Sequence, residues 1–521
     1  MKTRTKNVLF FAKQTGSCKG KGYSLVKREQ LGSRLGFIML SAGCAIGCGN
    51  VWKFPWMCGQ NGGGSFMLVY ILCLILLGIP ALVLEFSIGR AAQASPLFMY
   101  KKLEKPGQKW GIFGWFCLAG NIALMAFYTV VSGWIIYYFF RFLTGNHASL
   151  GFGAMISSPS VNVLFLLITL VVAFFILSFN LQGGLERVTK YMMSALLVLM
   201  LALAVHSLLL GGAGKGMSFY LKPDFSGITF KSVLVAMGQA FYSLSLGMGI
   251  MITYGSYTGK EVNLVRSTAM VCVFDTVVAL LAGLAIFPSV AHFDPSLLGS
   301  SKGVALMFII LPQVFESMGS VGQVVSFAFF VMVDIAAITS VVSLIEVVTQ
   351  FVIQKFHVHR KRAALVVACV CFVVSIPIGI SLGHVAILEE SSPALFGLDW
   401  LTFFDEVTNT VLMPVCALFS CIVVGWFITP KRAVAEIEAE GTPMSGWLKK
   451  VYAVMIRFVT PALILIVEIG GLQSEIAAGN TAVIVFAYAL VALCVVAYFA
   501  FFRNRDTGTN ADEKLSGDYP V

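Results

Sequence analysis

Apolar segments of about 20 residues, the length that crosses a bilayer as a helix, alternate with short polar segments along most of the chain. The pattern predicts twelve transmembrane helices, near residues 35–58, 65–89, 111–142, 161–179, 187–211, 232–256, 264–290, 319–353, 363–383, 400–428, 450–471 and 481–502. The short segments of alternating hydrophobicity that build a membrane β-barrel are not found in the sequence. We therefore expect an all-α polytopic membrane protein.

Composition supports this interpretation. The 521 residues are 58% hydrophobic and only 12% charged, with a mean hydropathy of +0.87. Soluble domains are roughly half apolar and a quarter charged. The 12 cysteines lie mostly within apolar segments and form no CxxC pair with metal-binding spacing. We expect them to fill space as small apolar residues.

Positive charge is concentrated in alternate loops. The net charge is +11, and lysines and arginines gather near 2–28, 101–109, 355–362, 431–450 and 503–505. The positive-inside rule assigns these segments to the cytoplasm. Both termini are then cytoplasmic, as a basic arm at 1–34 and a tail at 503–521. The larger outer loops fall near 143–160, 212–231 and 291–318. Since no single soluble domain collects the positive charge, we expect no nucleic-acid partner.

Two predicted spans are interrupted in the middle. The first contains GCAIGCGNVWKFP at 43–55, and the sixth contains GQAFYSLSLGMGIMITYGSY from Gly238. Interruptions five spans apart are typical of transporters built from two inverted repeats. We expect repeats at 35–211 (helices 1–5) and 232–428 (helices 6–10), followed by two further helices in 450–502.

Broken helices suit ion and solute binding. Irregular backbone at membrane depth is tolerated where protein or a water-filled cavity satisfies its polar groups. Freed carbonyls attract a cation, and the N-terminus of a half-helix attracts an anion. The alternative for Gly43 and Gly47 is close helix packing through a GxxxG pattern. Asn50 beside Gly49, together with the second interruption, favours a binding site.

Several motifs resemble one transporter family. RLGFIMLSAGCAIGCGNVWKFP and NGGGSFMLVYILCLILLGIPALVLEFSIGR, with GQAFYSLSLGMG in the sixth span and AAITS in the eighth, resemble the neurotransmitter:sodium symporters over roughly 28–470. The short outer loop at 143–160, which has no cysteine, is similar to prokaryotic members that transport leucine and other hydrophobic amino acids. The resemblance implies the leucine-transporter fold, sodium-driven symport and a multi-pass location in a bacterial inner membrane.

The resemblance also implies two sodium sites. The first would use Ala45, Asn50, Ser243 and Asp275, whose oxygens suit a hard cation. The second would use carbonyls of Gly43, Ile46 and Ala336 with the hydroxyls of Thr339 and Ser340. The alternative for these hydroxyls is a hydrogen bond back to their own helix.

The implied substrate site lies between spans one, three, six and eight. Its carboxylate would meet the N–H groups near Cys48 and Gly49 and the hydroxyl of Tyr128. Its ammonium group would meet carbonyls near Ala45, Tyr242 and Ser243, with Tyr242 as an aromatic lid. The side-chain pocket would comprise Cys44, Leu124, Tyr128, Ser245, Met248, Ser340 and Leu344. Because these residues are mostly apolar and Met248 is adaptable, we expect a neutral hydrophobic or aromatic amino acid.

Asp275 departs from the animal members, which have asparagine at this position. Tyr70, Gln239 and Ser243 match residues that bind chloride in chloride-dependent relatives, but Ala279 replaces a chloride-binding serine. A carboxylate in the membrane costs about 2.5–3.5 kcal/mol on insertion scales and needs compensation. We expect Asp275 to bind sodium and its fixed charge to replace chloride, so that two sodium ions and no chloride are used. An acid paired within the helix bundle is the alternative.

The gates follow the family in part. Lys53 and Asp405 would form the outer pair, with a snorkelling lysine as the alternative. Arg28 and Tyr257 match inner-gate residues. However, Leu31 replaces the usual tryptophan, Gln354 replaces the usual aspartate, and Ser194 stands where the fifth helix usually has proline. Asp334, Glu85 and Glu346 have no assigned role.

Two alternatives to sodium symport remain open on the sequence, and a third function is not expected. A non-transporting amino-acid sensor and a proton-coupled permease would use the same fold. An intramembrane enzyme is not expected, since the six histidines form no HExxH motif or similar cluster. The substrate, the sodium stoichiometry and the oligomeric state are not determined by the sequence.

Overall fold

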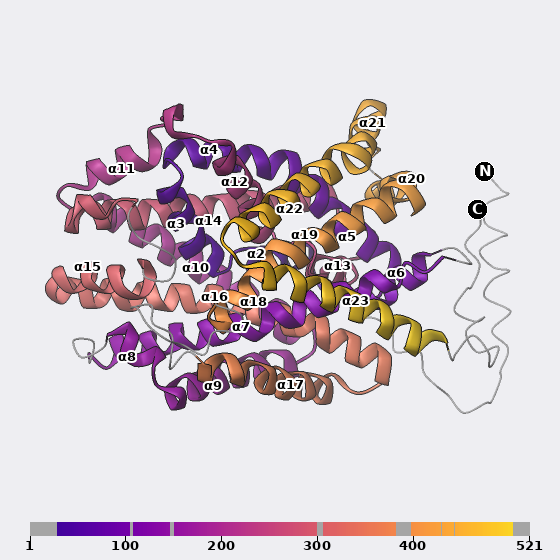
Figure 1. Ribbon diagram of the computed structural model, residues 1–521, viewed down its shortest axis with the longest axis horizontal. Coiled ribbons are helices and arrows are strands. Elements are labelled where there is room, and N and C mark those ends of the chain that lie inside the picture. Colours follow the sequence, from indigo (N-terminus) through magenta and orange to yellow (C-terminus); the bar gives the residue numbers. More distant parts are fainter. Residues whose placement is uncertain are drawn as a thin grey trace.

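The computed structural model describes residues 29–104, 108–145, 151–299, 306–381, 398–428, 430–441 and 443–503. The regular elements in these ranges are helices (Figure 1). Most of the expected N-terminal arm and C-terminal tail, including Arg28, lies outside the described residues.

Long apolar helices dominate the described part of the chain. Nine helical segments are long and apolar enough to cross a bilayer. They are α4–η2–α5 (Gly64–Ala92), α7 (Ile112–Leu143), α9 (Pro159–Ser178), η3–α10 (Gln182–Leu208), α14 (Leu264–Phe293), α16 (Gly319–Phe356), α17 (Arg360–Ser381), α18–η8–α19–η9 (Trp400–Ile428) and α21–η11–α22 (Gly446–Ala477). The first expected span is a bent pair of helices that counts as a tenth. The last expected span is occupied by α23 (Thr481–Arg503), and the sixth by two shorter helices.

The first span is interrupted where the sequence predicts. Helix α2 (Arg34–Ala45) is capped by the Ser33 side chain and ends where Ile46 leaves the helical conformation. The chain resumes as a π-helical turn, η1 (Gly49–Lys53), followed by α3 (Phe54–Gln60). The two halves are bent by 53°. The glycine-rich segment is therefore a true break in this span.

The sixth span is interrupted as well. Helix α12 (Phe230–Ser243) ends, and the chain turns before α13 (Ile250–Gly255) begins. Ser245, Gly247 and Gly249 have φ values of 51°, 82° and 74°, which is the left-handed region that glycine adopts without steric cost. At Gly247 a Cβ would also collide with the backbone carbonyl of Met413. Glycine is thus required there for conformation and for packing.

The two ends of the molecule carry different loops. Figure 1 shows α8 (Phe152–Ile156), α11 (Ala213–Leu221) and α15 (Leu311–Ser317) at one end, and α6 (Pro96–Leu103) and α20 (Pro430–Ile437) at the other. The first three come from the expected outer loops, and the last two adjoin basic loops. Between the ends, α2 packs against α10, α14 and α16, while α16 runs along α7. Both breaks therefore lie in the middle of the helix bundle.

Candidate functional site

A cavity lies where the two broken spans meet α7, α16 and α19 (Met413–Ile422). Its lining consists of Cys44, Ala45, Gly47, Gly49, Leu124, Tyr128, Tyr242, Ser243, Ser245, Ile250, Ser340, Leu344 and Met413. Ten of the twelve residues expected around the substrate are in this set. The other two residues, Cys48 and Met248, are buried but do not line the cavity. Gly47, Ile250 and Met413 were not expected from the sequence.

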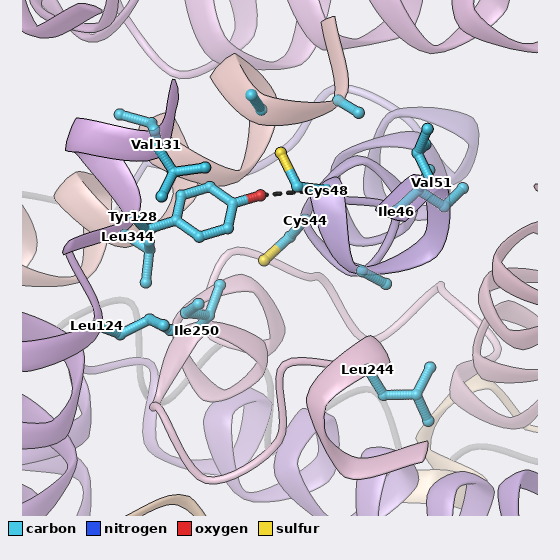
Figure 2. Packing of buried hydrophobic residues seen from close by; sticks show 14 of the residues in the cluster. Cys44, Ile46, Cys48, Val51, Leu124, Tyr128, Val131, Leu244, Ile250 and Leu344 are labelled. Atoms are coloured by element: carbon cyan, nitrogen blue, oxygen red, sulfur yellow. Dashed lines mark hydrogen bonds between the residues drawn. The ribbon is translucent and has the colours of Figure 1, made fainter. Parts of the chain in front are cut away.

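Tyr128 of α7 is directed at the break in the first span. The backbone N–H of Cys48 donates a hydrogen bond of 3.0 Å to the Tyr128 hydroxyl (Figure 2). A Cβ at Gly47 would lie 2.7 Å from Ser340 Oγ and 2.8 Å from Tyr128 Oη. Glycine thus allows α7 and α16 to approach the broken backbone. Because the Cys48 N–H donates to the Tyr128 oxygen, the hydroxyl hydrogen of Tyr128 is left to donate to a carboxylate in the cavity.

Figure 2 also shows the apolar side of the cavity. In this view Leu344, Leu124 and Ile250 lie beside and below the Tyr128 ring, and the Cys44 thiol lies below the hydroxyl end of the ring. The side chains that line the cavity carry neither a carboxylate nor a cationic group among the described residues. Such a lining fits a neutral apolar side chain better than a charged one.

Asp275 of α14 is the centre of a buried polar cluster beside the cavity. Its carboxylate accepts hydrogen bonds from Asn50 Nδ2 at 2.7 Å, Ser243 Oγ at 2.7 and 2.8 Å, and Tyr70 Oη at 3.0 Å. All four side chains are buried. Among the ion pairs of the described residues, none involves Asp275. The Asp275 carboxylate is thus contacted by neutral donors and not by a cationic side chain among the described residues. Its oxygens and those of its neighbours are hard ligands suited to a small cation.

Two neighbours of this cluster bear on chloride. Gln239 donates to the Gly49 carbonyl at 3.5 Å, and its own Oε1 has no hydrogen-bond partner among the described residues. Ala279, one turn from Asp275 on α14, is buried and contributes no polar atom. Asp275 is therefore the acidic side chain of this cluster.

The residues expected at the second sodium site lie where α16 meets the end of α2. Ser340 Oγ contacts the Cys44 carbonyl at 3.3 Å and the Ala336 carbonyl at 3.2 Å. Thr339 Oγ1 donates back to its own helix, to Ile335 and Ala336 at 3.0 Å. Ile46 is buried at the break, and Gly43 packs against Thr189 and Met193 of α10. The two hydroxyls thus adopt the back-bonded geometry considered as the alternative, next to a cluster of carbonyl oxygens.

Glu85 has a structural partner that the sequence did not reveal. Its Oε1 accepts the Gly247 N–H at 2.8 Å, while Oε2 has no partner among the described residues. The Glu85 side chain on α5 therefore stabilises the unwound segment of the sixth span. Asp334 on α16 also has an oxygen, Oδ1, without a hydrogen-bond partner in the described part of the chain.

The two residues expected at the outer gate lie in contact. Lys53 Nζ lies 3.5 Å from Asp405 Oδ2. The same ammonium group sits 4.2 Å from the centre of the Tyr242 ring, a cation–π distance. Lys53 therefore joins the first span to the tenth directly above the aromatic lid.

Tyr257, which is expected at the inner gate, belongs to a larger polar network. Arg360 of α17 bonds Glu346 at 2.7 Å and Glu29 at 3.0 Å. Tyr257 and Gln350 also donate to Glu346, and the Leu31 N–H donates to the Tyr257 carbonyl at 3.0 Å. Gln354 instead accepts the Ser95 N–H at 2.9 Å. Of the expected inner-gate residues, Tyr257 belongs to this network, and Arg28 lies outside the described residues.

Comparison with known proteins gives consistent matches. The family model described as "Sodium:neurotransmitter symporter family" matches residues 28–155 and 147–503. A sodium-dependent transporter of Bacillus subtilis, YhdH, is 35% identical over 85% of this chain and 97% of its own length. One from Haemophilus influenzae is 32% identical over 86% of this chain and 98% of its own. A sodium- and chloride-dependent betaine transporter of Caenorhabditis elegans is 26% identical over 73% of this chain and 70% of its own.

A solved structure matches as well. The crystal structure of MhsT in complex with L-phenylalanine has a TM-score of 0.76 and 35% sequence identity, and the match covers 85% of this chain and all of that one. The all-helical architecture with two broken spans is thus the leucine-transporter fold, as the resemblance implied.

Proposed function

Because the chain belongs to the sodium:neurotransmitter symporter family, whose members are multi-pass sodium-dependent transporters and not enzymes, we propose that it takes up a neutral hydrophobic or aromatic amino acid by sodium symport. The observation that carries the proposal is the cavity at the two broken spans. It combines the Tyr128 hydroxyl, which the Cys48 N–H holds in place, with an apolar wall. One end suits a carboxylate, and the other suits an uncharged side chain.

Two sodium ions support substrate binding in this proposal. One is held by Ala45, Asn50, Ser243 and Asp275, next to the substrate carboxylate. The other is held by Gly43, Ile46, Ala336, Thr339 and Ser340. The carboxylate of Asp275 lies within hydrogen-bonding distance of Asn50 and Ser243, so a cation there would be bound by a charged oxygen. That charge makes chloride unnecessary, in contrast to the chloride-dependent betaine transporter.

The energy of two sodium ions is sufficient for accumulation. Each positive charge moving inward across about 100 mV yields about 2.3 kcal/mol. Two ions therefore yield about 4.6 kcal/mol, which corresponds to about three decades of solute gradient at 1.4 kcal/mol per decade. Rocking of the broken spans against the remaining helices would expose the cavity to each side in turn. The protein would sit in a bacterial inner membrane with both termini in the cytoplasm, where its basic loops are expected.

A binding assay in detergent tests the proposal. The purified protein is incubated with labelled leucine, phenylalanine, tryptophan, lysine or glutamate in sodium or choline buffers, with chloride or gluconate as the anion. We expect binding of the first three only, dependent on sodium and independent of chloride. Asp275→Asn should weaken the apparent sodium affinity by about tenfold or more, because a charge-assisted contact is lost. The exposed Asp224→Asn is the control.

Three results would contradict the proposal. Binding in choline would favour a proton-coupled permease. Binding that requires chloride, or an unchanged sodium affinity in Asp275→Asn, would refute the role of the fixed charge.

A further inference from the structure

The tenth span contributes one residue to the lining of the cavity, Met413. This span runs through α18 (Trp400–Glu406), the π-helical segment η8 (Val407–Leu412) and α19. Met413 follows the π-helix directly, lines the cavity and is 2% exposed. Short π-helical segments within α-helices occur frequently at functional sites. Met413 is thus a wall residue from a span outside the four that were expected to surround the substrate.

The backbone at Met413 is held tightly. A Cβ at Gly247 would collide with the Met413 carbonyl and lie 3.2 Å from the Ala417 nitrogen. Pro414 follows at the start of α19 and restricts the backbone further. Since the main chain packs against the unwound sixth span, adjustment at this position is left to the thioether side chain. Methionine has three rotatable bonds and adapts to partners of different shape.

Met248, the adaptable wall expected from the sequence, lies elsewhere. Its Sδ and Cε atoms are each 3.2 Å from where a Cβ of Gly120 would be, and its side chain is fully buried. Leu412 packs at the same glycine. Met248 therefore fills the space between α7 and the tenth span, whereas Met413 faces the cavity.

The remaining apolar walls are less adaptable. Ile250 is β-branched and stiff at χ1, and it stands at the start of α13. Leu124 and Leu344 come from the long helices α7 and α16. Changing the volume at Met413 would alter the cavity without touching the residues that meet a carboxylate or a sodium ion.

We propose that Met413 sets the upper size limit for the substrate side chain. This inference rests on the proposed function. With the thioether extended into the cavity, small aliphatic side chains are well packed. With it displaced, an aromatic side chain is accommodated. Met413 is accordingly a specificity-determining residue.

The test compares dissociation constants of leucine and tryptophan in sodium buffer. In Met413→Ala, we expect the ratio of the tryptophan constant to the leucine constant to fall by about tenfold or more, because pocket contacts of methylene size discriminate by at least that factor. In Met413→Phe, which narrows the cavity, the ratio should rise. Met200→Ala removes an equally buried methionine of α10 and should leave the ratio within about twofold of wild type.

The outcomes distinguish failure of the Met413 inference from failure of the proposed function. If wild type binds leucine in sodium but the ratio is unchanged in both Met413 variants, the inference is wrong and the proposed function stands. If wild type binds no amino acid, both are wrong. Should Met413→Ala not fold, as judged by size-exclusion chromatography, the direction of the change in Met413→Phe decides. A rise supports the inference, and an unchanged or lower ratio overturns it.

Discussion

The residues expected at the outer gate and those expected at the inner gate are held together by different interactions. Outside, the closing ion pair is Lys53 with Asp405, whose side chains are 13% and 28% exposed and lie 3.5 Å apart. Inside, Arg360 is 11% exposed, and its partner Glu346 is fully buried at 2.7 Å. Glu346 also accepts from Tyr257 and Gln350, and Arg360 also binds Glu29.

The difference has an energetic consequence. Removing one partner from a buried ion pair costs about 3–5 kcal/mol, because a charge is left uncompensated. The Lys53–Asp405 pair is longer and its carboxylate is partly exposed, so we expect its loss to cost less, closer to the about 0–1 kcal/mol of solvent-exposed pairs. We therefore expect the outer side to open readily while the inner side stays shut, which suits a protein that must admit substrate from outside before it releases substrate inward.

The largest effect is expected from Arg360→Ala. The change leaves the Glu346 carboxylate buried without its cation, at a cost of about 3–5 kcal/mol to the inner-closed state. Hydrogen exchange at the start of α2 and α17 should become faster, and sodium-dependent leucine binding should weaken, since the closed state is less populated.

Arg362→Ala is the matched control for that change. Arg362 lies two residues further along α17 and is exposed. Arg362→Ala should leave both hydrogen exchange and sodium-dependent leucine binding at the wild-type level. Equal effects of the two arginine variants would show that the network does not hold the inner side shut.

A smaller effect is expected at the outer pair. Lys53→Ala removes a partly exposed ion pair worth about 1 kcal/mol or less and should speed leucine dissociation by about fivefold at most. The charge-swapped double variant Lys53→Asp with Asp405→Lys should restore part of the loss in a stopped-flow dissociation assay. The exposed Lys222→Ala serves as the control. If Lys53→Ala weakened leucine binding as much as Arg360→Ala does, the expected difference between the two sides would be wrong.

The smallest effect is expected from Gln354→Asp, which restores the acid usual in the family. Gln354 accepts a hydrogen bond from the Ser95 N–H and, among the described residues, forms no hydrogen bond or ion pair with Arg360. Because a carboxylate can also accept from that N–H, we expect a stability change of about 1 kcal/mol or less and leucine affinity within about twofold of wild type. A large gain in thermal stability would mean that this position still completes the inner gate.

Much of the fold and of the central site could be predicted from the sequence. Glycine and small polar residues in the middle of an apolar segment have few explanations in a bilayer, so the breaks near Gly47 and Gly247 were foreseeable. The cluster of Asn50, Ser243 and Asp275 followed from the resemblance. The pairing of Lys53 with Asp405 across 352 positions also depended on it.

Other parts depended on packing that a pattern does not encode. Met248 lies in the break of the sixth span and Met413 packs against that break from the tenth span, and only the packing at Gly120 and Gly247 decides which one lines the cavity. Glu85 looks like an isolated membrane acid until its oxygen meets the Gly247 N–H. Likewise, the side chains that bind Arg360 come from the N-terminal segment and from α16, and helical periodicity does not indicate which helices meet.

Uptake of labelled leucine into proteoliposomes tests the central claim most directly. The protein is reconstituted in vesicles loaded with potassium buffer and diluted into sodium, choline or lithium buffers, with chloride replaced by gluconate in parallel. We predict that leucine accumulates above the external concentration only with an inward sodium gradient, equally with either anion, and that a sodium ionophore abolishes the accumulation. Accumulation at full rate in choline, or binding without any flux in sodium, would contradict the account.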